Sequence, residues 1–142
     1  MERFKLKVAV YALLIKEDKI LLCRRFNTGW QDENYGLPSG HLESNETVTE
    51  ALLREVSEEV GIRLNLEDVE FVHAMHRKSN YIDLFFAVRS WAGEPKILEP
   101  DKCDDMQWFP LNSLPSNIVP SVRSAIQNHR SGILFSEPQS ED

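Results

Sequence analysis

Runs of apolar residues separated by polar turns predict a β-rich N-terminal segment. Residues 5–15 (KLKVAVYALLI) are rich in β-branched and aromatic side chains, and residues 20–25 (ILLCRR) continue the pattern after a Glu17-Asp18-Lys19 turn signal. These two segments predict a hairpin over residues 5–25. Three later segments also predict strands, at residues 69–76, 81–91 and 106–110.

Two other segments show the apolar spacing of helices. Between residues 48 and 60, apolar side chains recur every four residues and define one buried face. Thr47 and Glu50 fit a capping box at the start of this helix, and Gly61 follows its last turn. The apolar positions near the C-terminus predict a second helix at about residues 118–130.

Strands interrupted by one long helix and closed by another predict an α+β fold with a mixed β-sheet. The chain of 142 residues fits one domain of ordinary size, and an apolar share of 42% is enough for a core. No internal repeat or interdomain linker interrupts the pattern. We therefore expect a single domain over residues 1–135 and a polar, disordered tail over residues 136–142.

Charge and hydropathy narrow the range of partners. A net charge of −7 argues against a nucleic-acid polymer, because neutralising a phosphate backbone needs clustered Lys and Arg. No run approaches the length of a membrane span, and the N-terminus lacks the sections of a signal peptide. Cys23 and Cys103 lack CxxC spacing, which predicts reduced thiols. We expect a cytoplasmic protein without a membrane partner, either a monomer or a homodimer.

The candidate chemistry lies on the first helix. Glu55, Glu58 and Glu59 are spaced i, i+3 and i+4, so all three carboxylates project from one face. Two unit charges ~4 Å apart repel by roughly 1 kcal/mol in water and by several times that near a protein surface. Arg54 offsets part of this repulsion but cannot neutralise three carboxylates. A hard divalent cation such as Mg²⁺ can, since it prefers oxygen ligands and keeps positions for phosphate oxygens.

The full pattern around these glutamates is far more specific than an acidic cluster. Residues 40–62 match every fixed position of the Nudix box, G-x5-E-x7-R-E-U-x-E-E-x-G-U, with Val56 and Ile62 at the aliphatic U positions. A chance match at one start point is on the order of one in a billion at average residue frequencies. The chain therefore resembles the MutT-like Nudix hydrolases, and the resemblance extends to the order of the flanking strands.

This resemblance implies a Nudix α/β/α sandwich and Mg²⁺-dependent hydrolysis of a nucleoside diphosphate linked to another moiety. It implies Mg²⁺, with Mn²⁺ as a substitute, bound by Glu55, Glu58 and Glu59, with a carbonyl of Ser39 or Gly40 as a further ligand. It also implies that Arg54 orients a carboxylate and that Glu46 supports the site from the start of the helix.

The general base and the substrate contacts stay open among several residues. Glu58 or Glu59 can take the proton from water, and so can an acidic residue before the last strand, with Glu99 the first choice and Asp105 the second. Arg25 resembles a phosphate-binding basic residue of MutT-type enzymes, and Asn117 a base-reading amide. Trp30 can stack on a base, as can Phe26 or Tyr35, but core packing accounts for them equally well. His41 lies in the box loop, where it can face the substrate.

The sequence leaves three alternatives for the function of the protein. The first is hydrolysis of a (deoxy)nucleoside triphosphate to a monophosphate and pyrophosphate, which the small size of the chain favours. The second is hydrolysis of a nucleotide sugar, ADP-ribose or a dinucleoside polyphosphate. The third is a non-catalytic nucleotide sensor, which the complete set of box glutamates disfavours.

Overall fold

A computed structural model describes residues 1–138 of the chain. The predicted hairpin is confirmed: β1 (Lys7–Lys16) and β2 (Lys19–Arg25) pair antiparallel across a turn in which Glu17 and Asp18 have positive φ. The remaining elements, in chain order, are β3 (Tyr35–Gly36), β4 (Ser39–His41), α1 (Val48–Val60), the 3₁₀ helix η1 (Leu66–Asp68), β5 (Val69–Arg77), β6 (Tyr81–Val88), β7 (Cys103–Pro110), α2 (Pro120–Arg130) and β8 (Phe135–Ser136).

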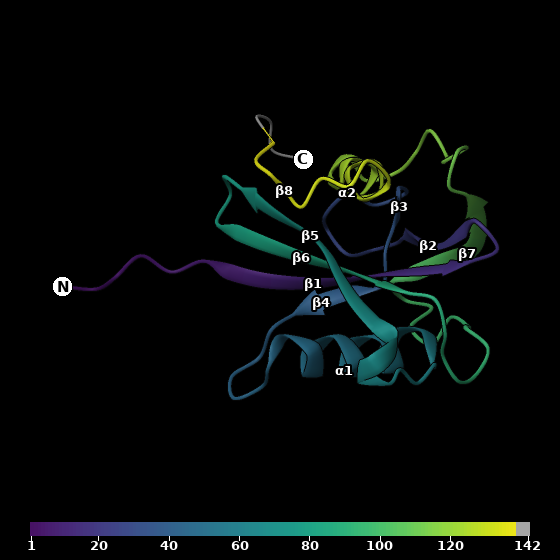
Figure 1. Ribbon diagram of the computed structural model, residues 1–142, viewed down its shortest axis with the longest axis horizontal. Coiled ribbons are helices and arrows are strands. Elements are labelled where there is room, and N and C mark those ends of the chain that lie inside the picture. The colour runs from purple at the N-terminus through teal and green to yellow at the C-terminus, as the bar shows by residue number, and fades with distance from the viewer. Residues whose placement is uncertain (139–142) are drawn as a thin grey trace.

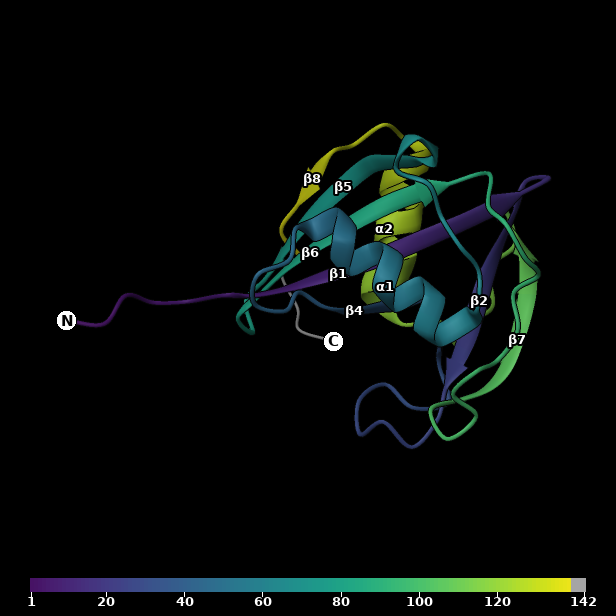
Figure 2. The ribbon, with the colours of Figure 1, turned by 90° about the horizontal axis from the view of Figure 1, so that it is seen from below.

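The sheet is mixed, as expected. Its strand order is β3-β2-β1-β6-β5-β8, with β4 pairing with β1 and β7 pairing with β2. The β1–β6 and β5–β8 pairs are parallel and the other pairs antiparallel. Helix α1 covers one face of the sheet and α2 the other, so the predicted α/β/α sandwich is confirmed (Figures 1 and 2).

Strand β1 forms the middle of both hydrophobic cores, which explains its unbroken apolar sequence. Tyr11 and Leu13 join the core under α2, whereas Val10, Ala12 and Leu14 join the core under α1. A strand buried on both faces cannot alternate between apolar and polar residues, because neither side of it meets water. β1 is therefore the fixed reference against which the site is positioned.

The start of α1 follows from its sequence. Thr47 Oγ1 accepts a hydrogen bond from the Glu50 amide at 3.1 Å, and the Glu50 carboxylate accepts one from the Thr47 amide at 2.7 Å. Gly61 ends the helix with a φ of 74°, a conformation that glycine adopts without strain. The predicted capping box and glycine C-cap are both confirmed.

The C-terminal part differs from the expectation. Strand β8 was not predicted, and it places Ser136 within the sheet although we assigned residue 136 to a disordered tail. The cause is buried His73, whose ring nitrogens lie 2.7 Å from the Ile133 carbonyl oxygen and 2.8 Å from Ser136 Oγ. Residues 139–142 of that expected tail lie outside the described part. Between residues 1 and 138, no helix is long and apolar enough to cross a membrane.

We predict that Thr47→Ala lowers the free energy of unfolding by about 1 kcal/mol, because it removes the side-chain acceptor that caps α1. Urea denaturation followed by circular dichroism measures the change. Ser57→Ala, at an exposed position within the same helix, is the matched control and should lose no stability. Equal stability of the Thr47 variant and the wild type would contradict this account of the cap.

Candidate active site

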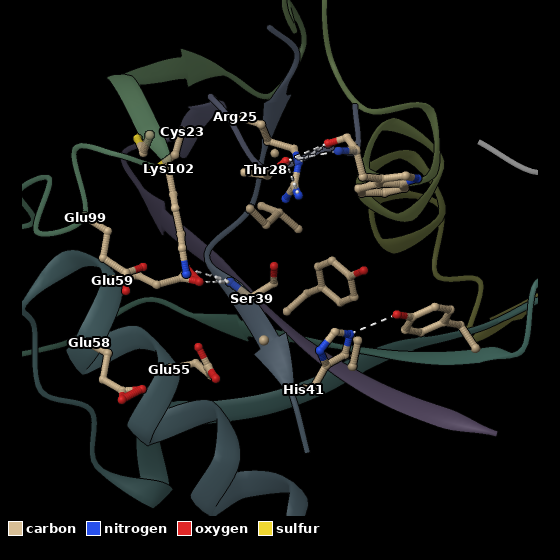
Figure 3. Close-up of a pocket in the computed structure, with 18 of the residues that line it drawn as sticks. Cys23, Arg25, Thr28, Ser39, His41, Glu55, Glu58, Glu59, Glu99 and Lys102 are labelled. Atoms are coloured by element: carbon tan, nitrogen blue, oxygen red, sulfur yellow. Dashed lines mark hydrogen bonds between the residues drawn. The ribbon is translucent and has the colours of Figure 1, made fainter. Parts of the chain in front are cut away.

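One cavity of about 930 Å³ lies between α1, β4, the end of β2 and the loop before β7. Helix α1 contributes Arg54 and the three box glutamates, and β4 contributes all three of its residues (Figure 3). Further contributors come from β2 with its following loop, the β5–β6 hairpin and the segment that leads into β7, among them Arg24, Arg25, Asn27, Thr28, Trp30, Arg77, Ser79, Tyr81, Glu99, Lys102 and Cys103.

Arg54 gathers the carboxylates around it. Its Nη1 donates to Glu55 Oε1 at 2.7 Å and to Glu58 Oε1 at 3.1 Å, so both carboxylates approach the same nitrogen atom. Its Nε and Nη2 form a fork with the Glu46 carboxylate at 3.2 and 2.8 Å. This ion pair, with a further bond from the Glu43 amide, lowers the pKa of Glu46. Glu46 does not line the cavity and acts on it through Arg54.

Glu59 lies outside the reach of Arg54 and is held by the backbone of β4. The Ser39 amide donates to both oxygens of this carboxylate, at 3.1 and 3.4 Å. Burial raises the pKa of Glu59 to about 8, and the nearby charges of Glu55 and Glu99 add to the shift. Burial also raises the pKa of Glu55, against the opposing effect of Arg54. Ionising Glu55 or Glu59 in the cation-free protein therefore carries an electrostatic penalty.

Gly40 is required by the close approach of β4 to α1. A Cβ atom built on Gly40 would lie 2.0 Å from Cδ of Glu55, closer than any real contact. Gly40 pairs with Val10 of the doubly buried β1, so β4 has no freedom to move away. The first fixed position of the box is therefore a glycine because the Glu55 carboxyl occupies the space of a side chain.

The residues present fit a hard divalent cation. Within residues 1–138, no set of three or more His, Cys, Asp or Glu side chains is already close enough to hold one ion, because Arg54 and Ser39 engage the glutamates separately. The donors are nonetheless carboxylates on one helical face, beside backbone that Gly40 brings into contact with Glu55. Their repulsion and the raised pKa of Glu59 are both relieved by a cation with oxygen ligands.

Three of the four predicted substrate-binding residues line the cavity, and Asn117 does not. Arg25, Trp30 and His41 line the cavity as expected. Arg25 donates to the Trp30 carbonyl at 2.7 Å and to Thr28 Oγ1 at 2.9 Å, and its guanidinium lies 4.9 Å from the centre of the Trp30 ring. Burial lowers the pKa of Arg25. Two of the five N–H donors of Arg25 therefore stabilise the loop that follows β2.

Asn117 is not brought to the cavity. Its amide donates to the Glu33 carbonyl at 3.0 Å, so it braces the same loop from outside. The second-choice base Asp105 is also absent from the cavity, and it accepts hydrogen bonds from Tyr35 and Gln107 instead.

Sequence reasoning missed Arg77 and Tyr81 as cavity residues. Buried Arg77 donates to Asp83 at 2.6 and 3.2 Å, and its guanidinium lies 4.4 Å from the Tyr81 ring and 5.5 Å from the Trp30 ring. Tyr81 Oη in turn lies 3.0 Å from His41 Nε2. A signal existed, since Asp83 is the one acidic residue of an apolar strand and a buried charge requires a partner.

Comparison with known proteins agrees with this geometry. The NUDIX domain family matches residues 5–129, so the chain belongs to this family. The crystal structure of a MutT NUDIX hydrolase from Burkholderia pseudomallei superposes with a TM-score of 0.79 at 27% identity, covering 85% of this chain and 95% of that one.

The curated relatives are longer than this chain, and the match covers only part of each. An ADP-ribose pyrophosphatase of Methanocaldococcus jannaschii is 32% identical over 76% of this chain and 64% of its own length. The human 8-oxo-dGDP phosphatase NUDT18 is 31% identical over 77% of this chain and 33% of its own length. An NAD-capped RNA hydrolase of Pseudomonas entomophila is 30% identical over 84% and 41%. The chain thus spans less than two thirds of each of these relatives.

We predict that Gly40→Ala weakens Mn²⁺ binding at least about tenfold, because the new methyl group displaces the Glu55 carboxyl. Calorimetric titration with Mn²⁺ measures the affinity. Gly36→Ala is the matched control, since Gly36 lines the same cavity but a Cβ there meets its nearest atom at 3.7 Å. Unchanged Mn²⁺ affinity in a folded Gly40 variant would refute the proposed ligand geometry.

A second prediction concerns pH in the absence of divalent cations. Burial raises the pKa of Glu59 to about 8 in the folded protein, whereas the unfolded chain releases this proton near the ordinary pKa of 4.5. Folding therefore loses stability as pH rises through this window and loses no more above it. Urea denaturation in EDTA should show a steeper decline with pH for the wild type than for Glu59→Gln. The exposed control Glu67→Gln should follow the wild type, and parallel curves for all three would count against the assignment.

Proposed function

We propose that the protein is a Mg²⁺-dependent hydrolase that cleaves a phosphoanhydride bond in a nucleoside diphosphate linked to another group. The observation that carries this proposal is the gathering of Glu55, Glu58 and Glu59 in one cavity around Arg54 and the β4 backbone. Membership of the NUDIX family supports it. So do the names of the relatives, which specify ADP-ribose, 8-oxo-dGDP and NAD-capped RNA.

In this proposal Glu55, Glu58 and Glu59 hold Mg²⁺, or Mn²⁺ in its place, with a carbonyl oxygen of Ser39 or Gly40 as a further ligand. Held by these residues, a cation would supply charge neutralisation for the pyrophosphate and would acidify a bound water. Arg54 keeps Glu55 and Glu58 turned toward the cavity, and Glu46 fixes Arg54 through its paired hydrogen bonds. The hydrogen bonds of Arg54 and Glu46 are thus consistent with the positioning roles proposed for them.

The proton of the attacking water needs an acceptor within the same cavity. Glu99 lines it from the loop before β7 and faces the carboxylates of α1 across the opening (Figure 3). Glu99 is therefore our first choice, with Glu58 and Glu59 as alternatives on the helix. Asp105 is not proposed again, because its carboxylate is engaged outside the cavity.

For the substrate we propose a (deoxy)nucleoside triphosphate, cleaved to a monophosphate and pyrophosphate. The aromatic side of the cavity, which contains Trp30, Tyr81 and His41, offers flat surfaces for a base. A second candidate is ADP-ribose or a nucleotide sugar, which the 32% identity to an ADP-ribose pyrophosphatase favours. A non-catalytic sensor is a weaker candidate, since every box glutamate is present.

We predict that Glu58→Gln and Glu59→Gln each lower kcat by a factor of about 10² or more, because each removes a charge that holds the cation. Release of phosphate or pyrophosphate from a panel of nucleotides with Mg²⁺ measures turnover. The exposed Glu67→Gln variant should retain full turnover, and circular dichroism should show the native fold in all three. Near-native kcat in both box variants would reject this site, and nucleotide binding without any turnover by the wild type would indicate a sensor.

A further inference from the structure

The Arg and Lys side chains of the cavity differ in how far they are already engaged. Arg54 and Arg77 each hold carboxylates, Arg24 donates to Asp104 at 2.8 Å, and Arg25 donates to the loop that contains Thr28. Lys102 is the fifth basic residue that lines the cavity. Within residues 1–138, its ammonium group is the one member of this set without a hydrogen bond or ion pair to the protein.

The backbone of Lys102 is fixed although its side chain is exposed. Its amide donates to the Glu99 carbonyl at 2.9 Å, and its carbonyl accepts from the Phe26 amide at 2.9 Å. These bonds tie the loop before β7 to the end of β2. From this point the side chain extends into the cavity toward Glu59 (Figure 3).

The cavity therefore has two chemically different ends. Figure 3 shows Lys102, Glu59 and Glu99 on one side and His41 on the other, with Ser39 between them. His41 is bonded to Tyr81, so the second end is aromatic. A nucleotide whose base lies at the aromatic end and whose diphosphate lies at the carboxylates directs its distal group toward Lys102.

The charge of that distal group decides what Lys102 can contribute. Cations held by the glutamates neutralise the phosphates that they touch, and a further phosphate still carries charge of its own. A flexible ammonium group suits this task, because it presents three donors and adapts its position. A neutral sugar at the same place gives the ammonium group no charge to neutralise.

We propose that Lys102 binds the terminal phosphate of a nucleoside triphosphate and so makes the protein select triphosphates over diphosphates that end in a sugar. This inference rests on the proposed function and names the residue that decides its substrate class. It transfers to Lys102 the phosphate contact that we had expected from Arg25, whose Nε and Nη2 already donate to the loop after β2.

The test compares two substrates in each variant. In Lys102→Ala we expect kcat/KM for ATP to fall at least about tenfold, mainly through KM, while kcat/KM for ADP-ribose changes less than about twofold. Lys102→Arg should recover most of the loss because it restores the positive charge. Lys96→Ala, in the same loop but outside the cavity, is the matched control and should leave both values unchanged. Equal losses on both substrates, or no loss on ATP, would overturn the proposal.

A binding experiment separates this proposal from the proposed function. Calorimetric titration with α,β-methylene-ATP and Mg²⁺ measures affinity without hydrolysis. If the wild type hydrolyses nothing yet binds this analogue at least about tenfold more tightly than Lys102→Ala does, the hydrolase proposal fails and the role of Lys102 stands. If the two proteins bind it equally, or if the wild type does not bind it, the role of Lys102 is refuted.

Discussion

Mutual repulsion among the glutamates on one face of α1 is the constraint on which the rest of the site depends. Arg54 meets part of it by sharing its guanidinium among Glu46, Glu55 and Glu58. Glu59 receives hydrogen bonds only from the Ser39 amide, and its pKa is raised chiefly by burial and further by the charges of Glu55 and Glu99. Without a cation, Glu59 therefore keeps a proton up to about pH 8. In the proposed function a bound divalent ion would take the place of that proton, which gives a reason for the unfavourable arrangement.

The same packing that builds the core creates this arrangement. Leu52 and Val56 bury the apolar face of α1 against Val10 of β1. β4 pairs with β1 at Val10 itself, so Gly40 is held directly beside the helix. The Glu55 carboxyl then fills the space that a side chain on Gly40 would need. The stability of the core and the geometry of the site thus both follow from the packing of α1 against β1 and against β4, which pairs with β1.

Short sequence patterns correctly predicted the elements that depend on contacts between residues close together in the chain. The capping box of α1, its glycine C-cap and the hairpin of β1 and β2 each depend on residues close together in the chain. The box glutamates and Arg54 were likewise predictable, since helical spacing places them on one face. Long-range contacts decided the rest. β8 forms because the His73 ring hydrogen-bonds to residues some 60 positions further along the chain. No short sequence pattern predicts such a contact.

On the substrate side, contacts that the sequence pattern did not predict engage two of the expected residues. Asn117 was chosen by its position before the last helix, but the Glu33 carbonyl from a distant loop engages its amide. Arg25 was chosen as a basic residue at a strand end, yet its donors meet Thr28 and the Trp30 carbonyl. A sequence shows how many basic side chains a protein has. It does not show which of them already bind other groups of the folded protein.

If the proposed function holds, this distinction explains how a chain with a net charge of −7 would bind a polyphosphate. Positive charge in the cavity does not follow from composition, because four guanidinium groups there satisfy carboxylates or backbone oxygens. In the proposed function, two positive charges act on the substrate: the cation that the glutamates would attract, and the Lys102 ammonium group, which has no partner in the described chain. An acidic surface is compatible with an anionic substrate because it concentrates divalent cations, and the fold needs to supply only the last charge itself.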